Sequence, residues 1–207
     1  MRVLPMLFCL TLLAGLSRAA GPATLTQPSD SPLVSFRILF QTGPASDPKG
    51  KEGVAALTAA MLSEGGSAQM PYDEIVKKLF PMAASVNAQV DKEMIVFHGT
   101  VHVEKLEEYY GILRQMLLEP GWREEDFRRL KDEALNFLRI ELRANNEEEL
   151  GKEVLYLNIY KNHPYGHQNS GTIAALEAEQ DSSPSAPRPQ LFWHSHADIL
   201  QSFQKNQ

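Results

Sequence analysis

The chain has 207 residues, of which 43% are hydrophobic and 22% are charged. This length and balance suit one domain with its own hydrophobic core. The formal net charge is -6 at pH 7, which argues against nucleic acids and anionic lipids as partners.

The first 19 residues have the features of a secretory signal peptide. Arg2 precedes an apolar run over residues 4–16, and small residues follow, with cleavage expected after Ala19. The run is too short for a stable membrane span, and a retained signal anchor is the alternative. Export predicts a periplasmic or extracellular protein that has no membrane contact once the signal is removed.

Removal of the signal changes the composition of the mature chain. Cys9 is the only cysteine and leaves with the signal. The mature protein therefore has no disulfide and no thiol chemistry, although it enters an oxidising space. Loss of Arg2 and Arg18 leaves 18 Lys and Arg against 26 Asp and Glu, a net charge of -8.

The chain after the signal begins with a leader, a strand and a helix. Residues 20–32 are rich in Pro, Ser and Thr and predict a flexible leader. Strict alternation over 33–40 predicts a half-buried strand. Glycines bracket the segment 50–66, whose apolar residues recur at helical spacing and predict a helix of about three turns. Its other face consists of small residues, so another backbone can come very close.

The rest of the chain predicts further helices and one hairpin. Alternating runs within 84–101, separated by Asp91-Lys92-Glu93, predict the hairpin. Helices are expected over residues 72–80, 104–118, 123–143, 147–160 and 172–177. In the 104–118 helix we expect the inward residues to be Leu106, Tyr109, Tyr110, Leu113 and Leu117. Because strands and helices do not alternate strictly, the predicted class is α+β, a mainly antiparallel sheet packed against helices.

The helix within 50–66 resembles the first helix of the pitrilysin/insulinase family of zinc metallopeptidases. Gly53 and Ala55 match its start, and Met61, Leu62 and Gly65 match its end. The turn His163-Pro164-Tyr165-Gly166 also fits the family. The resemblance covers residues 33–177 and implies an incomplete pitrilysin-like metallohydrolase domain.

The catalytic content of that helix is absent. Active members carry an inverted His-x-x-Glu-His motif, whose histidines hold zinc and whose glutamate acts as general base. Here these positions fall on Ala56, Ala59 and Ala60, which have no donor atoms. The third ligand position falls on Leu138 or Arg139, neither of which binds zinc. We therefore expect no catalytic residue, no metal and no cofactor, zinc being the cofactor of active relatives.

A second part of the resemblance concerns substrate. Val86-Asn87-Ala88 resembles the strand that lies along bound peptide in active members. The resemblance implies that Asn87 and Ala88 bind substrate, the strand edge pairing with peptide main chain. The alternative is that Asn87 satisfies a nearby backbone group.

Other candidate sites and the end of the chain add little. The histidine pairs 98/102, 163/167 and 194/196 are expected to be structural or solvated. Residues 178–207 depart from the family and include a Pro- and Ser-rich stretch, 181–190, that predicts disorder. Truncation, a reading-frame change and a natural short form all remain open for this tail.

These features predict a secreted, non-catalytic homologue of the zinc peptidases, the non-catalytic half or partner of a peptide-processing assembly. Its expected partners are peptides or unfolded protein segments, and an active family member or second domain. The alternative is a metal-independent peptide-binding or scaffold module of the cell envelope.

The signal peptide gives a direct prediction. We expect residues 1–19 to be absent from the exported product, because the apolar run ends in a small-residue cleavage site. Intact-mass spectrometry of that product measures this, and an exported chain that retains Met1 would show that the signal is an anchor.

Overall fold

The computed structural model describes residues 30–178. The expected signal peptide, most of the leader, residues 179–207 of the tail, Cys9 and the histidines at 194 and 196 lie outside the described residues. Within the described part, no helix is long and apolar enough to cross a membrane.

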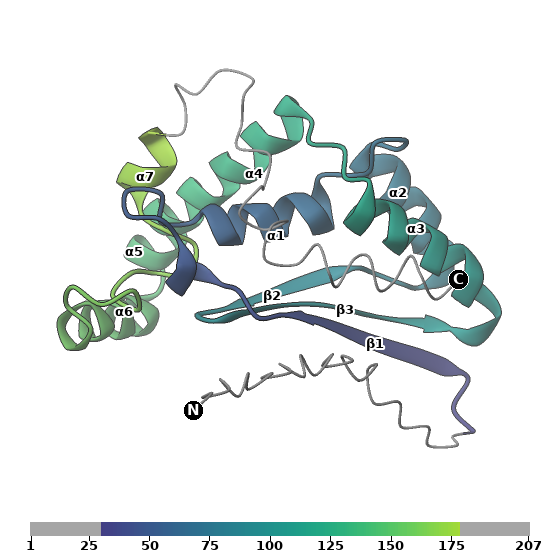
Figure 1. Cartoon of the computed structure of the whole chain (residues 1–207), viewed down its shortest axis with the longest axis horizontal. Coiled ribbons are helices and arrows are strands. Elements are labelled where there is room, and N and C mark those ends of the chain that lie inside the picture. The colour runs from purple at the N-terminus through teal and green to yellow at the C-terminus, as the bar shows by residue number, and fades with distance from the viewer. Residues whose placement is uncertain (1–29, 179–207) are drawn as a thin grey trace, which may run out of the picture. The chain divides into compact units, whose positions relative to one another are not determined.

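Three antiparallel strands form the sheet. They are β1 (Leu33–Phe40), β2 (Asn87–Asp91) and β3 (Met94–His102), in the order β1-β3-β2 (Figure 1). β2 and β3 make the expected hairpin, although β2 begins only at Asn87, three residues later than the alternating pattern suggests. In the described residues β2 is an edge strand, because it pairs with β3 on one side only.

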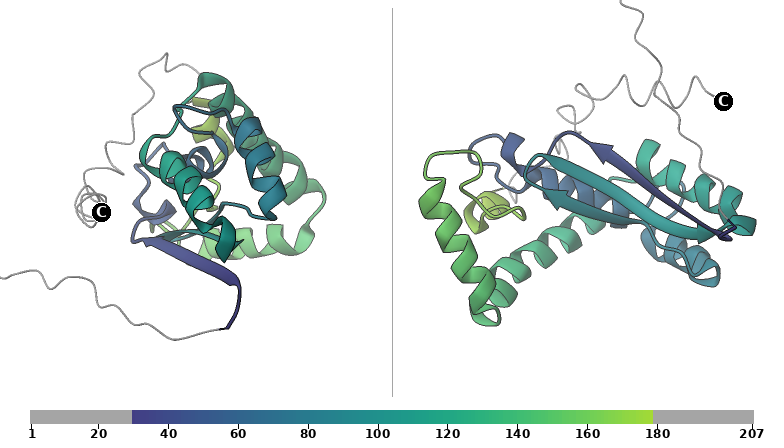
Figure 2. Two further views of the ribbon diagram at one scale, coloured as in Figure 1. Left: turned by 90° about the vertical axis from the view of Figure 1, so that its right-hand side faces the viewer. Right: turned by 90° about the horizontal axis from the view of Figure 1, so that it is seen from below.

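Three helices lie on one side of this sheet. Figure 1 shows α1, α2 and α3 above the strands, and the right panel of Figure 2 shows the strands toward the viewer with α1 behind them. The bounds are α1 Val54–Glu64, α2 Tyr72–Leu79, α3 Leu106–Leu118, α4 Glu124–Asn136, α5 Leu142–Ala144, α6 Glu147–Ile159 and α7 Ile173–Ala178. Short 3-10 turns cover Pro44–Ser46, Phe80–Met82 and Val103–Lys105. The predicted α+β class is confirmed.

Alternation places the apolar face of each strand under the helices. On β1, Phe36, Ile38 and Phe40 face inward, whereas Ser35 and Arg37 are exposed. One part of the core joins β3 to α2 and α3 through fully buried side chains, Ile75, Val101, Tyr109 and Met116. A second part joins the sheet to α1.

Two details differ from the sequence pattern. On α3, Leu106 and Tyr110 are about 40% exposed, and Ile112 and Met116 are buried instead. The buried stripe starts at Tyr109 and follows i, i+3, i+4 and i+7, which defines one helix face. Leu106 lies at the first residue of the helix, and Tyr110 is turned away from that stripe.

The long helix expected over 123–143 is also interrupted. Residues Phe137–Glu141 form a π-helix, η4, between α4 and α5. The wider turn shifts the helical register, so Leu138 is buried while Phe137 is 39% exposed. The apolar spacing over 123–143 predicts one inward stripe that includes both residues, and this prediction is wrong for Phe137.

Close packing at Gly99 predicts a large stability effect. A Cβ on Gly99 of β3 would clash with the Tyr109 hydroxyl and the Ser85 carbonyl, which are hydrogen-bonded to each other at 2.9 Å. We expect Gly99→Ala to lower the free energy of unfolding by about 1–3 kcal/mol.

Gly111 provides the matched control. It lies inside α3, and the space that a Cβ would occupy there is open, so Gly111→Ala should raise stability by about 0.5–1 kcal/mol. Urea unfolding of the full chain measures both changes, and equal effects of the two substitutions would refute the proposed packing at Gly99.

Candidate functional site

The helix that resembles the zinc motif is seated firmly on the sheet. Its start is fixed by Asp47, whose carboxylate accepts hydrogen bonds from the N–H groups of Gly53 (2.7 Å) and Ala55 (3.0 Å). Burial raises the pKa of the Asp47 carboxyl, and these two bonds partly offset that effect. Gly53 has a φ of 113°, and a Cβ there would lie 2.8 Å from the Ser170 carbonyl oxygen. Glycine is therefore required at this position.

Two of the three alanines of the motif pack in apolar clusters. Ala59 is 0% exposed and packs in the cluster with Phe40 and Phe97, whose rings meet edge to face at 5.7 Å. Ala60 packs toward α4 beside Leu130. Ala56 is half-buried. Ala59 and Ala60 therefore serve packing between α1, the sheet and α4.

The region of the expected third ligand is equally unsuited to zinc. Leu138 is 1% exposed and packs with Leu135, Leu142 and Leu176. Arg139 is ion-paired with Glu177 of α7. The side chains at all the motif positions are hydrocarbon or cationic, so they do not fit a zinc ion.

No alternative metal site appears in residues 30–178, where no three His, Cys, Asp or Glu side chains are grouped suitably. Three of the described histidines take part in local contacts. His102 accepts from the Glu104 N–H at 3.3 Å, and His163 accepts from the Tyr165 N–H at 3.2 Å. His167 lies 3.1 Å from the Pro44 carbonyl oxygen.

The expected peptide-binding pair lies on β2, the edge strand beside α1. Asn87 is exposed, and its side-chain amide donates to the Ser85 hydroxyl at 2.8 Å. Ala88 is half-buried and packs against the apolar cluster under α1. Their side chains therefore point to opposite faces of the sheet, as the period of a strand requires.

A loop residue that the sequence did not single out meets the same edge. Asn169, between α6 and α7, donates from its side-chain amide to the Val90 carbonyl at 3.0 Å. Backbone groups of alternate residues on a strand point to the same side. Since the Val90 carbonyl points away from β3, the N–H and carbonyl of Ala88 point outward too.

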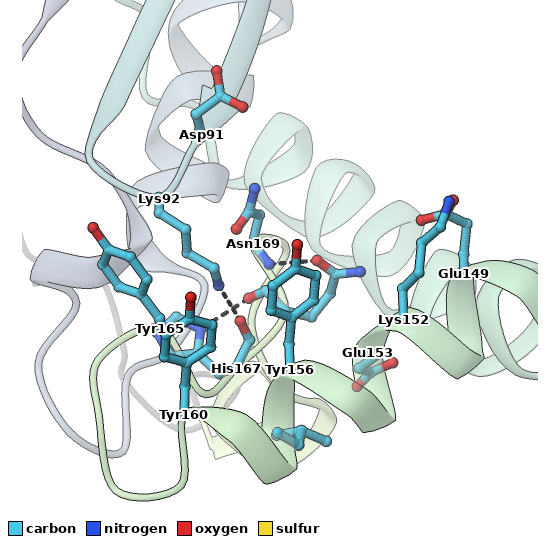
Figure 3. A pocket seen from close by; sticks show the side chains of 12 residues that line it. Asp91, Lys92, Glu149, Lys152, Glu153, Tyr156, Tyr160, Tyr165, His167 and Asn169 are labelled. Carbon is cyan, nitrogen blue, oxygen red and sulfur yellow. Dashed lines mark hydrogen bonds and ion pairs between the residues drawn. The ribbon is translucent and has the colours of Figure 1, made fainter.

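A pocket of about 390 Å³ continues from this edge to α6. Figure 3 shows Lys92 of the hairpin extended toward tyrosines of α6 and the following loop, whereas the Asp91 side chain points away from them. The pocket is lined by Asp91, Lys92, Glu149, Lys152, Glu153, Tyr156, Leu157, Tyr160, Tyr165, His167, Gln168 and Asn169. Tyr156 and Tyr160 stack with ring centroids 5.8 Å apart.

Two lysines and a tyrosine that line this pocket already have partners. The Lys92 ammonium donates to the His167 carbonyl, and burial lowers the pKa of this lysine. Lys152 is ion-paired with Glu148 and Glu149 at 2.8 and 2.7 Å. A hydrogen bond to Glu93 raises the pKa of the Tyr165 phenol. These groups engage one another, and the region offers an unpaired strand edge next to a polar, aromatic pocket.

The sequence of this chain matches the model of one known protein family. Residues 24–173 match the family model described as Insulinase (Peptidase family M16), which covers more than half of the chain. This chain belongs to the insulinase family. Its resemblance to the pitrilysin-like peptidases is thereby confirmed. Among curated proteins, none matches the sequence significantly.

Solved structures agree with this assignment. A peptidase M16 inactive domain from Pseudomonas fluorescens is 25% identical with a TM-score of 0.62, over 73% of this chain and 38% of that chain. Pitrilysin is 20% identical with a TM-score of 0.61, over 80% of this chain and 17% of that chain. The periplasmic protease PqqL from Escherichia coli is 14% identical with a TM-score of 0.63, over 78% and 18%. The last two support the fold alone, and this insulinase-family chain spans well under half the length of all three.

The alanines predict how this chain responds to zinc. We expect the purified chain to hold no stoichiometric zinc after dialysis, because Ala56, Ala59 and Ala60 supply no ligand atoms. Metal analysis that finds one tightly held zinc per chain would contradict this expectation.

Restoring the motif should also fail. In the triple variant Ala56→His, Ala59→Glu, Ala60→His, the third ligand is still missing, and a carboxylate enters the apolar cluster around Ala59. We expect no full peptidase activity and a loss of about 3 kcal/mol in the free energy of unfolding. The double variant Ala56→His, Ala60→His is the control, and it should lose much less stability.

Proposed function

We propose that this chain is an exported, non-catalytic member of the insulinase family that holds extended peptides at the edge of β2. In this proposal it acts as the non-catalytic half of a peptide-processing assembly, and an active family member or second domain supplies zinc and the general base.

One observation carries the proposal. Ala59 is fully buried and Leu138 is 1% exposed, so these motif positions serve packing, while the β2 edge beside α1 keeps outward backbone groups at Ala88. Strand addition uses main-chain hydrogen bonds and needs no metal. Peptide capture can therefore persist where hydrolysis is lost.

The comparisons support two further parts of the proposal, namely the lack of catalysis and the export of the chain. The neighbour from Pseudomonas fluorescens is described as an inactive M16 domain, which gives a precedent for a member without catalysis. The neighbour PqqL is described as periplasmic, and this agrees with the signal-like start of the chain.

Co-purification tests the assembly. We expect an active family member from the same cell to bind the full chain one to one. If peptide binding is found without any such partner, the chain is a metal-independent peptide-binding or scaffold module of the cell envelope.

Binding by this chain alone should be weak, because each main-chain hydrogen bond contributes only about 0.5–1.5 kcal/mol net. We expect Ala88→Pro to weaken binding of a labelled Thr- and Val-rich octapeptide by about two- to tenfold. Proline removes the outward N–H of Ala88 and is tolerated on an edge strand, so the pairing of β2 with β3 is kept.

Asn87→Ala is the matched control, since it leaves the backbone edge intact and should change affinity less than Ala88→Pro. Fluorescence anisotropy measures both affinities, and circular dichroism checks the fold. If the wild-type and Ala88→Pro chains bind with equal affinity and the fold is unchanged, the β2 edge does not bind the peptide. A structural subunit would then be the better explanation.

A further inference from the structure

The contact between Asn169 and β2 bears on how far a peptide can extend along this edge. Val90 and Ala88 are the two residues of β2 whose backbone groups point outward, by the alternation described above. The Asn169 amide already donates to the Val90 carbonyl at 3.0 Å. It occupies the acceptor that the N–H of an added strand would use.

The loop that carries Asn169 is held from several directions. The His167 carbonyl accepts from the Lys92 ammonium of the β2–β3 turn, and Figure 3 shows Lys92 extended toward this loop. At the other end, the Thr172 N–H donates to the Glu52 carbonyl at 3.3 Å. A Cβ on Gly171, whose φ is 93°, would clash with the same carbonyl.

These anchors make Asn169 a fixed part of the edge. Its own N–H is bonded to the Gln168 side-chain oxygen at 2.6 Å. An incoming peptide must therefore either displace a positioned amide or stop short of it. An exposed strand edge also invites pairing between copies of a protein, and a side-chain donor on the last carbonyl restricts such pairing.

We propose that Asn169 is a register-setting residue that closes the β2 edge at Val90, so that a bound peptide places its matching N–H and carbonyl opposite Ala88. This inference rests on the proposed peptide-binding function and adds a rule for it. The ligand is an extended peptide whose last main-chain contact on this side is with Ala88, and longer peptides gain no further main-chain acceptor at Val90.

An N-methyl scan of the peptide tests this rule on the full chain. The probe is the labelled Thr- and Val-rich octapeptide, prepared with a single N-methyl group at each residue in turn. For the wild-type chain, methylation should weaken binding at the residue whose N–H meets the Ala88 carbonyl and not at the residue next to Val90. In Asn169→Ala the Val90 carbonyl becomes available, so a second sensitive residue should appear two positions along.

The unmethylated peptide should bind Asn169→Ala about two- to tenfold more tightly than the wild-type chain, since one hydrogen bond is gained. Asn158→Ala is the matched control, because the Asn158 amide donates at 2.7 Å to the Val154 carbonyl of its own helix, α6. It should change neither affinity nor the methylation pattern. If Asn169→Ala does not fold, Asn169→Asp keeps the size, removes the donor and should give the same second sensitive residue.

The outcomes separate this inference from the function on which it rests. An unchanged methylation pattern and affinity in a folded Asn169 variant would overturn the register role while leaving peptide binding in place. Binding by Asn169→Ala but not by the wild-type chain would overturn the proposed function and support closure of the edge. Absence of binding in both chains would overturn both.

Discussion

The contact between α1 and the sheet is the constraint on which the rest of this structure depends. Ala59 is fully buried in the apolar cluster with Phe40 and Phe97, and α1 packs on its other side against α4. Interiors are packed nearly as densely as organic crystals, so a larger or charged side chain has no room here without moving the sheet. The same small side chains that let the helix come close are the ones that leave a zinc ion without ligands.

Loss of the metal positions does not remove the neighbouring edge, because the two features depend on different physics. Zinc needs several donor side chains at defined positions, whereas pairing with a peptide needs outward N–H and carbonyl groups on a strand. β2 keeps those groups at Ala88, and its position is set by pairing with β3 and by packing under α1. Asn169 donates to the Val90 carbonyl, and in our proposal this contact limits the edge there. Under the function that we propose, this member of the insulinase family lacks hydrolysis and retains a surface for extended chains.

Local patterns in the sequence predicted most of the fold and only part of the site. Alternation identified β1, and bracketing glycines identified α1, because the period of the chain and the φ of Gly53 are local properties. The π-helix at η4, which turns Phe137 outward, has no comparable signal, since it depends on how the long helix fits its neighbours. The contact of Asn169 with Val90 joins residues 79 positions apart. Single-sequence spacing cannot predict such a contact, which requires the fold itself.

The central claim is that packing, and not a metal ion, holds α1 in place. Urea unfolding of the full chain in micromolar zinc and in excess chelator tests it directly. A ligand that binds the folded state raises the free energy of unfolding by RT ln(1 + [L]/Kd), about 2.7 kcal/mol at one hundred times Kd. The account predicts the same unfolding midpoint in both solutions. A midpoint that rises with zinc and falls with chelator would show that a metal stabilises the fold and would contradict the account.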